Sequence, residues 1–254
     1  IVAAAGNNDH SEPIFPCAYK GVVCVGSIDP NKNFSDFSNF GGYVDVLAPG
    51  NNILSTYTRA KTPLIFDFEG YEIKSGTSQA APYVAALAAL IKTVNPEIGE
   101  KDVKAKIFTS TYVPYSIGKK YTSGGKIKFD KAIWEKAPVY IHPDFKTLKR
   151  VKVNAKTKEF NFELNIDNLS AMSTGLQLEI KNNSALNFDK NTVNISNISA
   201  KEIKTVTISG SVKDLNNHLF QTVQFKLSYA GKSYTYSNEI RMYVDFDENE
   251  NILR

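Results

Sequence analysis

The stretch KSGTSQAAPYVAALAALIK, residues 74–92, places a serine at the start of a long apolar helix. A helix N-terminus presents unpaired backbone N–H groups and the positive end of the helix dipole, which suits a site where negative charge develops. Gly76 permits tight backbone geometry before the helix, and Ala80 and Ala81 allow close approach to its neighbours. Ser78 is therefore a candidate nucleophile, although serine at this position is also a common helix cap.

The sequence around this helix alternates short apolar runs with helical patterns. The runs end at Gly or Pro and are typical of strands buried on both faces of a parallel sheet. They predict an α/β fold up to about residue 137. The predicted strands are IVAAAG (1–6), GVVCVGS (21–27) and YVDVLAPG (43–50), and the predicted helices are 78–93, 97–109 and 129–137.

The pattern changes after about residue 148, where polar and apolar residues alternate with Asn, Ser, Asp and Gly clusters between the runs. Such spacing predicts an all-β antiparallel sandwich of the immunoglobulin or fibronectin kind. We therefore divide the chain into an α/β part (1–137), a proline-containing linker (138–147) and a β-sandwich domain (148–254). The alternating runs are 158–166, 175–182, 203–212, 222–231 and 233–246.

Composition excludes two classes of partner. The net charge is +4, and the basic residues are interspersed with acidic ones rather than gathered, so no nucleic-acid partner is predicted. The longest apolar run, residues 80–91, is shorter than the ~20 residues that a transmembrane helix needs. With 42% hydrophobic residues the chain is expected to be folded and soluble.

The chain has two cysteines, Cys17 and Cys24. If residues 18–24 are extended at about 3.3 Å per residue, the two Cα atoms lie beyond the ~7 Å that a disulfide tolerates. The expectation is two separate buried thiols.

Four stretches resemble, in order and spacing, the C-terminal half of the catalytic domain of subtilisin-like serine proteases. A fifth, GGKIKFDKAI (124–133), resembles the closing helix of that family. The resemblance covers about residues 1–137 and implies the C-terminal part of a subtilisin-like parallel-sheet domain. The four stretches are VAAAGNN (2–8), FPCAYKGVVCVGS (15–27), FSDFSNFGGYVDVLAPGNNILST (34–56) and SGTSQAAPYVAALAALI (75–91).

The resemblance implies roles for individual residues. Ser78 matches the nucleophile of the family, and Asn7 matches the side-chain donor of its oxyanion hole. Taken alone, Asn7 beside Gly6 would be a turn residue. The resemblance also implies a substrate pocket walled by Ala4, Ala5 and Gly6, with Ile14 and Cys17 at its base. Because Ile14 and Cys17 are bulky, we expect a shallow pocket that prefers small or medium apolar side chains.

The base that activates Ser78 is not evident in the chain. In the resembling family the triad runs Asp, His, Ser along the sequence, and His10, His142 and His218 have no matching context, so each is expected to be a surface histidine. The resemblance implies that the Asp and His come from an N-terminal half, either a separate chain after nicking or a segment outside these 254 residues. An unpaired strand at residues 1–6 would make the piece prone to aggregate alone.

Two function classes follow from these observations. The first is a secreted or cell-envelope serine endopeptidase acting on protein or peptide substrates. The alternative is an inactive subtilisin-like scaffold whose β-sandwich docks a partner. The resemblance implies that catalysis requires no cofactor and that any structural calcium is bound by the N-terminal half. The tail DFDENEN (245–251) lacks the glycine of a calcium loop and is expected to be solvated, so no metal ligand is assigned.

Overall fold

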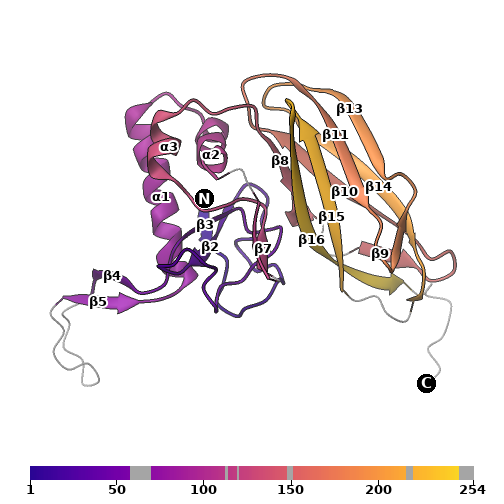
Figure 1. Cartoon of the computed structure of the whole chain (residues 1–254), viewed down its shortest axis with the longest axis horizontal. Helices are drawn as coiled ribbons and strands as arrows, with labels where there is room; N and C mark the ends of the chain where they lie inside the picture. The colour runs from indigo at the N-terminus through magenta and orange to yellow at the C-terminus, as the bar shows by residue number, and fades with distance from the viewer. Residues whose placement is uncertain (58–69, 112–113, 119, 148–150, 216–219, 246–254) are drawn as a thin grey trace.

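Two regions of different architecture lie side by side in the computed structural model (Figure 1). One carries the helices and a short parallel sheet, and the other is built from longer strands. The structure describes residues 1–57, 70–111, 114–118, 120–147, 151–215 and 220–245.

The parallel sheet consists of three apolar segments, as predicted. The strands β1 (Val2–Ala4), β2 (Val23–Ile28) and β3 (Val46–Pro49) are parallel and lie in that order. The central strand β2 is buried along its whole length, which explains why its sequence does not alternate. The outer edge of β3 is covered by residues 125–127, whose backbone bonds to Leu47.

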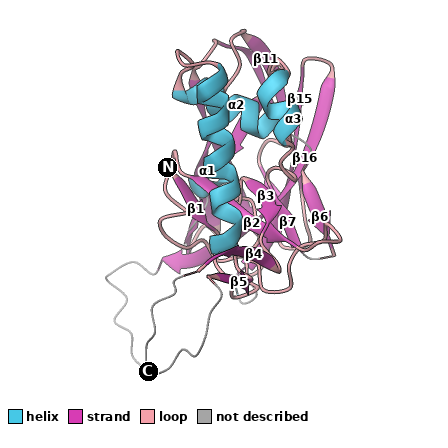
Figure 2. Cartoon of the chain, turned by 90° about the vertical axis from the view of Figure 1, so that its left-hand side faces the viewer, coloured by secondary structure: helices cyan, strands magenta, loops and turns pink. Residues whose placement is uncertain are grey.

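One long helix packs on this sheet. The helix α1 (Thr77–Val94) contacts β1, β2 and β3, and α2 (Glu100–Thr109) and α3 (Phe129–Trp134) pack beside it (Figure 2). All three predicted helices are confirmed, but α2 begins later than predicted because Ile98 N–H closes a turn onto Asn95 O at 3.0 Å. No helix in the described ranges combines the length and hydropathy of a membrane span. The buried residues of α1 recur every three or four positions, as on a one-faced helix: Thr77, Ala80, Val84, Leu87 and Ile91.

Two hairpins extend from this region. The strands β4 (Ile53–Thr56) and β5 (Tyr71–Lys74) form one antiparallel pair, which lies between β3 and α1 in the sequence. The strands β6 (Tyr115–Ile117) and β7 (Lys120–Thr122) form the other pair, which lies between α2 and α3 in the sequence. Neither hairpin was predicted from the sequence.

The second region contains the five predicted strands and four more within the described residues. They form one path in the order β12-β14-β10-β9-β16-β15-β11-β13, with β8 paired to β10. All pairs are antiparallel except β9 with β16. Their bounds are β8 Ile141–Asp144, β9 Val151–Asn154, β10 Glu159–Asn168, β11 Thr174–Lys181, β12 Leu186–Phe188, β13 Thr192–Ile198, β14 Ile203–Val212, β15 Phe220–Tyr229 and β16 Lys232–Asp245.

The strands of this region share one hydrophobic core. It draws side chains from β10 and β14 at one end of the path and from β11, β15 and β16 at the other, so the path folds over a common core. The predicted linker, 138–147, contains β8 and the 3-10 helix Phe145–Thr147, and its residues Tyr140 and Ile141 are buried. The boundaries of a separate sandwich domain remain a prediction.

The expectation of two separate thiols is wrong, because Cys17 and Cys24 form a disulfide with their Cα atoms 4.9 Å apart. The segment between them is not extended. Consecutive turns, including Tyr19 N–H to Pro16 O at 3.0 Å, reverse the chain, and Gly21 adopts a positive φ of 85°. The sequence calculation failed because it assigned strand geometry to these turns.

Candidate active site

Ser78 lies in the first turn of α1, and its position is set by a close approach of two loops. Gly76 N–H donates to Gly50 O at 2.8 Å, which joins the end of β3 to the start of α1. A Cβ on Gly50 would lie 2.5 Å from Ser27 Oγ and 2.7 Å from Gly76 O, so only glycine permits this approach. Ser78 itself is exposed. Neither its hydroxyl nor its N–H bonds to another group in the described part of the chain.

Asn7 lies just beyond β1 and is held by the residue that precedes Ser78. Its Oδ1 accepts hydrogen bonds from Thr77 N–H at 2.8 Å and from Thr77 Oγ1 at 3.0 Å. A backbone N–H can only donate, so the atom that it contacts must be the amide oxygen. The Nδ2 group of Asn7 is consequently the end of the side chain that remains to donate.

The backbone around Asn7 is fixed from two other sides. Gly6 N–H donates to Thr77 Oγ1 at 3.0 Å. The fully buried Asn39 donates its N–H to Gly6 O at 2.9 Å and accepts from Asn8 N–H at 2.8 Å. Sequence reasoning did not identify Thr77 or Asn39 as site residues, although both lie in the motif stretches that suggested the site.

Two potential donors, Asn7 Nδ2 and Ser78 N–H, lie close to one point beside Gly76. An ideal Cβ built on Gly76 would lie 3.4 Å from Asn7 Nδ2 and 3.7 Å from Ser78 N. The same position is 2.7 Å from Gln79 Oε1, a side-chain end that can move, and the φ of 157° at Gly76 is what disfavours other residues there. The first turn of α1 has no acidic residue and no side-chain cap. The arrangement can therefore receive a developing negative charge next to a serine hydroxyl.

Among the five predicted pocket residues, Ala5, Cys17 and Ile14 pack in one cluster and Gly6 bonds to Thr77, but only some of the five have a free surface. Ala5 and Cys17 are completely buried, whereas Ala4, Gly6 and Ile14 are partly exposed. Ile14 Cδ1 would lie 2.7 Å from a Cβ on Gly6, so the Ile14 side chain packs directly on the Gly6 backbone. Behind this wall the Tyr43 hydroxyl faces Ala5 O at 3.5 Å, and burial raises the pKa of Tyr43, so that hydroxyl stays neutral.

The described histidines are engaged away from Ser78. His142 Nε2 lies 3.5 Å from Asp45 Oδ1, and its ring centroid is 4.8 Å from that of Phe108. His142 is mostly buried, so the expectation of a surface histidine is wrong for it. His10 Nδ1 accepts from Glu12 N–H at 3.2 Å. His218 lies outside the described residues.

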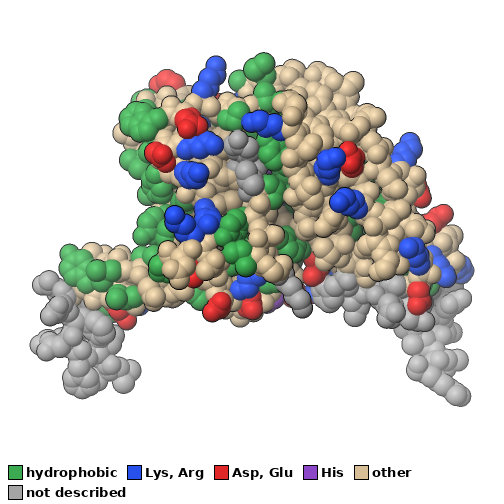
Figure 3. Space-filling view, viewed as in Figure 1, with side chains coloured by type: hydrophobic (Ala, Val, Ile, Leu, Met, Phe, Trp, Pro, Cys, Tyr) green, Lys and Arg blue, Asp and Glu red, His purple; other side chains and the backbone are tan. Residues whose placement is uncertain are grey.

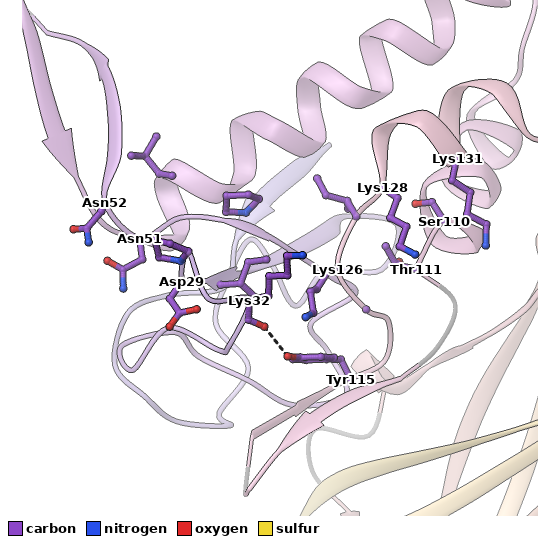
Figure 4. A pocket seen from close by; sticks show the side chains of 16 residues that line it. Asp29, Lys32, Asn51, Asn52, Ser110, Thr111, Tyr115, Lys126, Lys128 and Lys131 are labelled. Atoms are coloured by element: carbon purple, nitrogen blue, oxygen red, sulfur yellow. Dashed lines mark hydrogen bonds between the residues drawn. The ribbon is translucent and has the colours of Figure 1, made fainter.

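The cavity with the clearest definition in the described residues is not lined by Ser78. In the described ranges no group of His, Cys, Asp and Glu side chains could hold a metal ion, and the predicted acidic tail lies almost entirely outside those ranges. A cavity of about 850 Å³ lies instead between the ends of β2 and β3 and the start of α3. Figure 4 shows Lys126 and Lys128 at this cavity, where the Tyr115 hydroxyl donates to Lys32 O at 2.6 Å.

Comparison with known proteins adds the following. The profile of the Subtilase family matches residues 1–162. The chain is 45% identical over 91 residues to the thermophilic serine proteinase of Bacillus sp. (strain AK1), covering 36% of this chain and 20% of that protein. It is 43% identical over 91 residues to thermitase of Thermoactinomyces vulgaris, covering 36% and 29%. It is 40% identical over 96 residues to subtilisin BL of Lederbergia lenta, covering 38% and 32%.

The chain thus spans between a fifth and a third of the length of these relatives. Among solved structures, a protease from Pseudoalteromonas arctica PAMC 21717 is similar over 51% of this chain and 40% of that chain. The sequence identity is 30% and the TM-score is 0.45.

Proposed function

This chain belongs to the subtilase family, and from that premise we propose that it carries the nucleophile of a serine endopeptidase, with Ser78 forming the acyl-enzyme and Asn7 donating to the oxyanion. The observation that carries the proposal is the proximity of two donors, Asn7 Nδ2 and Ser78 N–H, which lie 3.4 Å and 3.7 Å from one point beside Gly76. Hydrogen bonds position both donors, because Thr77 binds Asn7 Oδ1 and Gly76 N–H binds Gly50 O beside Ser78.

The proposed reaction follows from these positions. Ser78 Oγ attacks the scissile carbonyl carbon while its proton passes to an imidazole, and the carbonyl oxygen becomes an oxyanion between the two donors. Collapse of this intermediate breaks the C–N bond, and the amine leaves with that proton. The acyl group on Ser78 Oγ is then hydrolysed by a water molecule that the same imidazole deprotonates.

The imidazole and its orienting carboxylate are proposed to come from an N-terminal half that is not part of residues 1–254. Two surfaces support such a partner. The strand β1 pairs only with β2 in the described structure, so its other edge is available. The outer side of α1 carries exposed apolar side chains, visible in the left part of Figure 3. They are Ala85, Ala86, Ala89, Leu90 and Val94.

The substrate is proposed to be a protein or peptide whose residue before the scissile bond has a small or medium apolar side chain. Ile14 supports this, because it packs onto Gly6 and narrows the space beside the wall formed by Ala4. Cleavage of a peptide library measures the preference. Leading cleavage after Phe, Tyr or Arg would contradict it.

The cellular location of the protein is proposed from its disulfide. The disulfide between Cys17 and Cys24 is a feature of oxidising compartments, which supports secretion or a cell-envelope location. The proposed chemistry uses side chains alone and needs no cofactor. The strand region from residue 148 onward is proposed to be an accessory β-sandwich domain.

The test uses the full-length protein and a chromogenic peptide. Ser78→Ala should abolish hydrolysis, and a fluorophosphonate should label wild type on Ser78 alone. Ser116→Ala, at an exposed position of β6, is the matched control and should retain hydrolysis. Undiminished hydrolysis by Ser78→Ala would reject the proposal, and no hydrolysis by wild type would favour an inactive scaffold.

A further inference from the structure

We propose that the antiparallel strand region holds the substrate pocket in shape, through Glu239, Arg241 and Lys146 acting as positioning residues at the two ends of one loop. We call residues 11–22 the pocket loop, since it contains Ile14 and Cys17. The inference rests on the proposed protease function, because it assigns a purpose to contacts around that pocket.

The first end of the pocket loop is held by β16. Ser11 Oγ donates to Glu239 Oε1 at 2.8 Å, and the Arg241 guanidinium forms an ion pair with Glu12. Glu239 and Arg241 alternate along one strand and therefore face the same side. Their strand is itself fixed, because Thr222 and Phe220 of β15 pair with them in register.

The second end of the pocket loop is held by Lys146, which follows β8. Lys146 Nζ donates to Val22 O, the last carbonyl of the loop, and forms an ion pair with Asp45 Oδ2 at 2.6 Å. Asp45 Oδ2 also accepts from Cys24 N–H at 2.7 Å. The side chains of Lys146 and Asp45 are only 6% and 2% exposed.

Because the ion pair between Lys146 and Asp45 is buried, it restricts the positions of both side chains. A buried charge is costly unless its partner and hydrogen bonds are in place, so the arrangement tolerates little displacement. Burial alone would raise the pKa of Asp45, but Lys146, then His142 and the Cys24 amide, outweigh it and lower that pKa. The carboxylate therefore stays charged and keeps its hold on Lys146 at neutral pH.

The contacts of the pocket loop with β16 and Lys146 come from a different part of the chain than the contacts that hold Asn7. Asn7 is fixed by Thr77 and Asn39, all within the α/β region. The two ends of the pocket loop, at Ser11 and Val22, are held by residues that follow position 140 in the sequence. Loosening the loop should therefore alter which side chain the pocket accepts and leave transition-state stabilisation intact.

The test compares variants of the full-length protein at the exposed end of the arrangement. Glu239→Ala with Arg241→Ala removes both β16 contacts, whereas Glu239→Gln with Arg241→Lys keeps an acceptor and a cation. Thr235→Ala with Ser237→Ala, on the same side of β16, is the matched control. Steady-state kinetics use peptides that differ only in the residue before the scissile bond, Ala, Leu or Phe.

The alanine pair should raise KM and change the ratio of kcat/KM between these peptides by about tenfold, with kcat on the best peptide nearly unchanged. The conservative pair should restore the wild-type ratio. Amide hydrogen exchange should accelerate roughly tenfold in residues 14–22 and stay unchanged in α1. Lys146→Met should produce the same pattern more strongly, if it folds.

Unchanged selectivity and unchanged exchange in the alanine pair would overturn the inference. Equal losses of kcat on all peptides, with faster exchange in α1, would also overturn it, because that is general destabilisation. If wild type hydrolyses no peptide, the proposed function fails, and the exchange measurement alone still decides whether the strand region holds the loop.

Discussion

Asn7 is held by Thr77 through its amide oxygen, so the same side chain is both a structural contact and a proposed catalytic donor. The two roles use different atoms. A substitution that keeps the oxygen and replaces the nitrogen separates them, because the contact with Thr77 survives while the donor is lost.

Asn7→Asp should lower kcat by about 10²–10³ and leave KM within a few-fold, because the donor binds charge that exists only in the transition state. The magnitude is the one known for removing this kind of donor in a subtilisin and is carried over to this chain. Steady-state kinetics of the full-length protein measure both constants. The control is Asn8→Asp, which adds the same charge at an exposed neighbour. A rise in KM at constant kcat would make Asn7 a ground-state contact instead.

The ionisation of Asp45 predicts how the stability of the fold depends on pH. The pKa of Asp45 is lower in the folded protein than in the unfolded chain, where it is about 3.9. Its stabilising contribution is therefore present above that value and is lost as the pH falls through the lower folded pKa.

Asp45→Asn should lower the free energy of unfolding at pH 7 by about 3–5 kcal/mol, because Lys146 then lies buried without its partner. The difference from wild type should narrow below about pH 4. Urea unfolding between pH 7 and pH 2.5 measures it, with the exposed Asp36→Asn as control. A difference that is constant over this range would show that ionisation of Asp45 contributes nothing.

At the scale of elements, the sequence predicted the three parallel strands, the helices and the five longest antiparallel strands, because each has a clear hydrophobic period. The hairpins β4–β5 and β6–β7 were missed because their strands have only three or four residues and show no alternation of buried and exposed positions. The disulfide was missed for a different reason. Turns of residues 16–22 have no periodic signal, and only the folded chain shows that they return Cys24 to Cys17.

The disulfide joins Cys17 of the pocket loop to Cys24 of β2. Cys17→Ala with Cys24→Ala should lower the free energy of unfolding by about 2–3 kcal/mol, from the entropy of an eight-residue loop in the unfolded chain. Urea unfolding with and without a reductant measures the loss. The reductant should destabilise wild type and leave the double variant unchanged. Equal sensitivity of both proteins would mean that the thiols are not bonded.

In the whole molecule, some residues of the candidate site could be predicted from the sequence and others could not. Ser78 and Asn7 were predicted because both lie in strong local motifs. Their supporting residues Thr77 and Asn39 were not, since hydrogen bonds between residues about 30 to 70 positions apart leave no local pattern. The contacts of Lys146 and Arg241 with the pocket loop span more than 100 positions and depend on how the two regions pack.

Ser78 is proposed to be a nucleophile whose activating imidazole lies outside residues 1–254. The most direct test is the rate at which a fluorophosphonate labels Ser78, located by peptide mapping, in the full-length protein and in residues 1–254 alone. A general base contributes typically 10²–10⁴-fold, so labelling of residues 1–254 alone should be slower by at least about 10²-fold. Adding back the N-terminal half should restore it. Equal rates in the two samples, or a label on another residue, would contradict the claim.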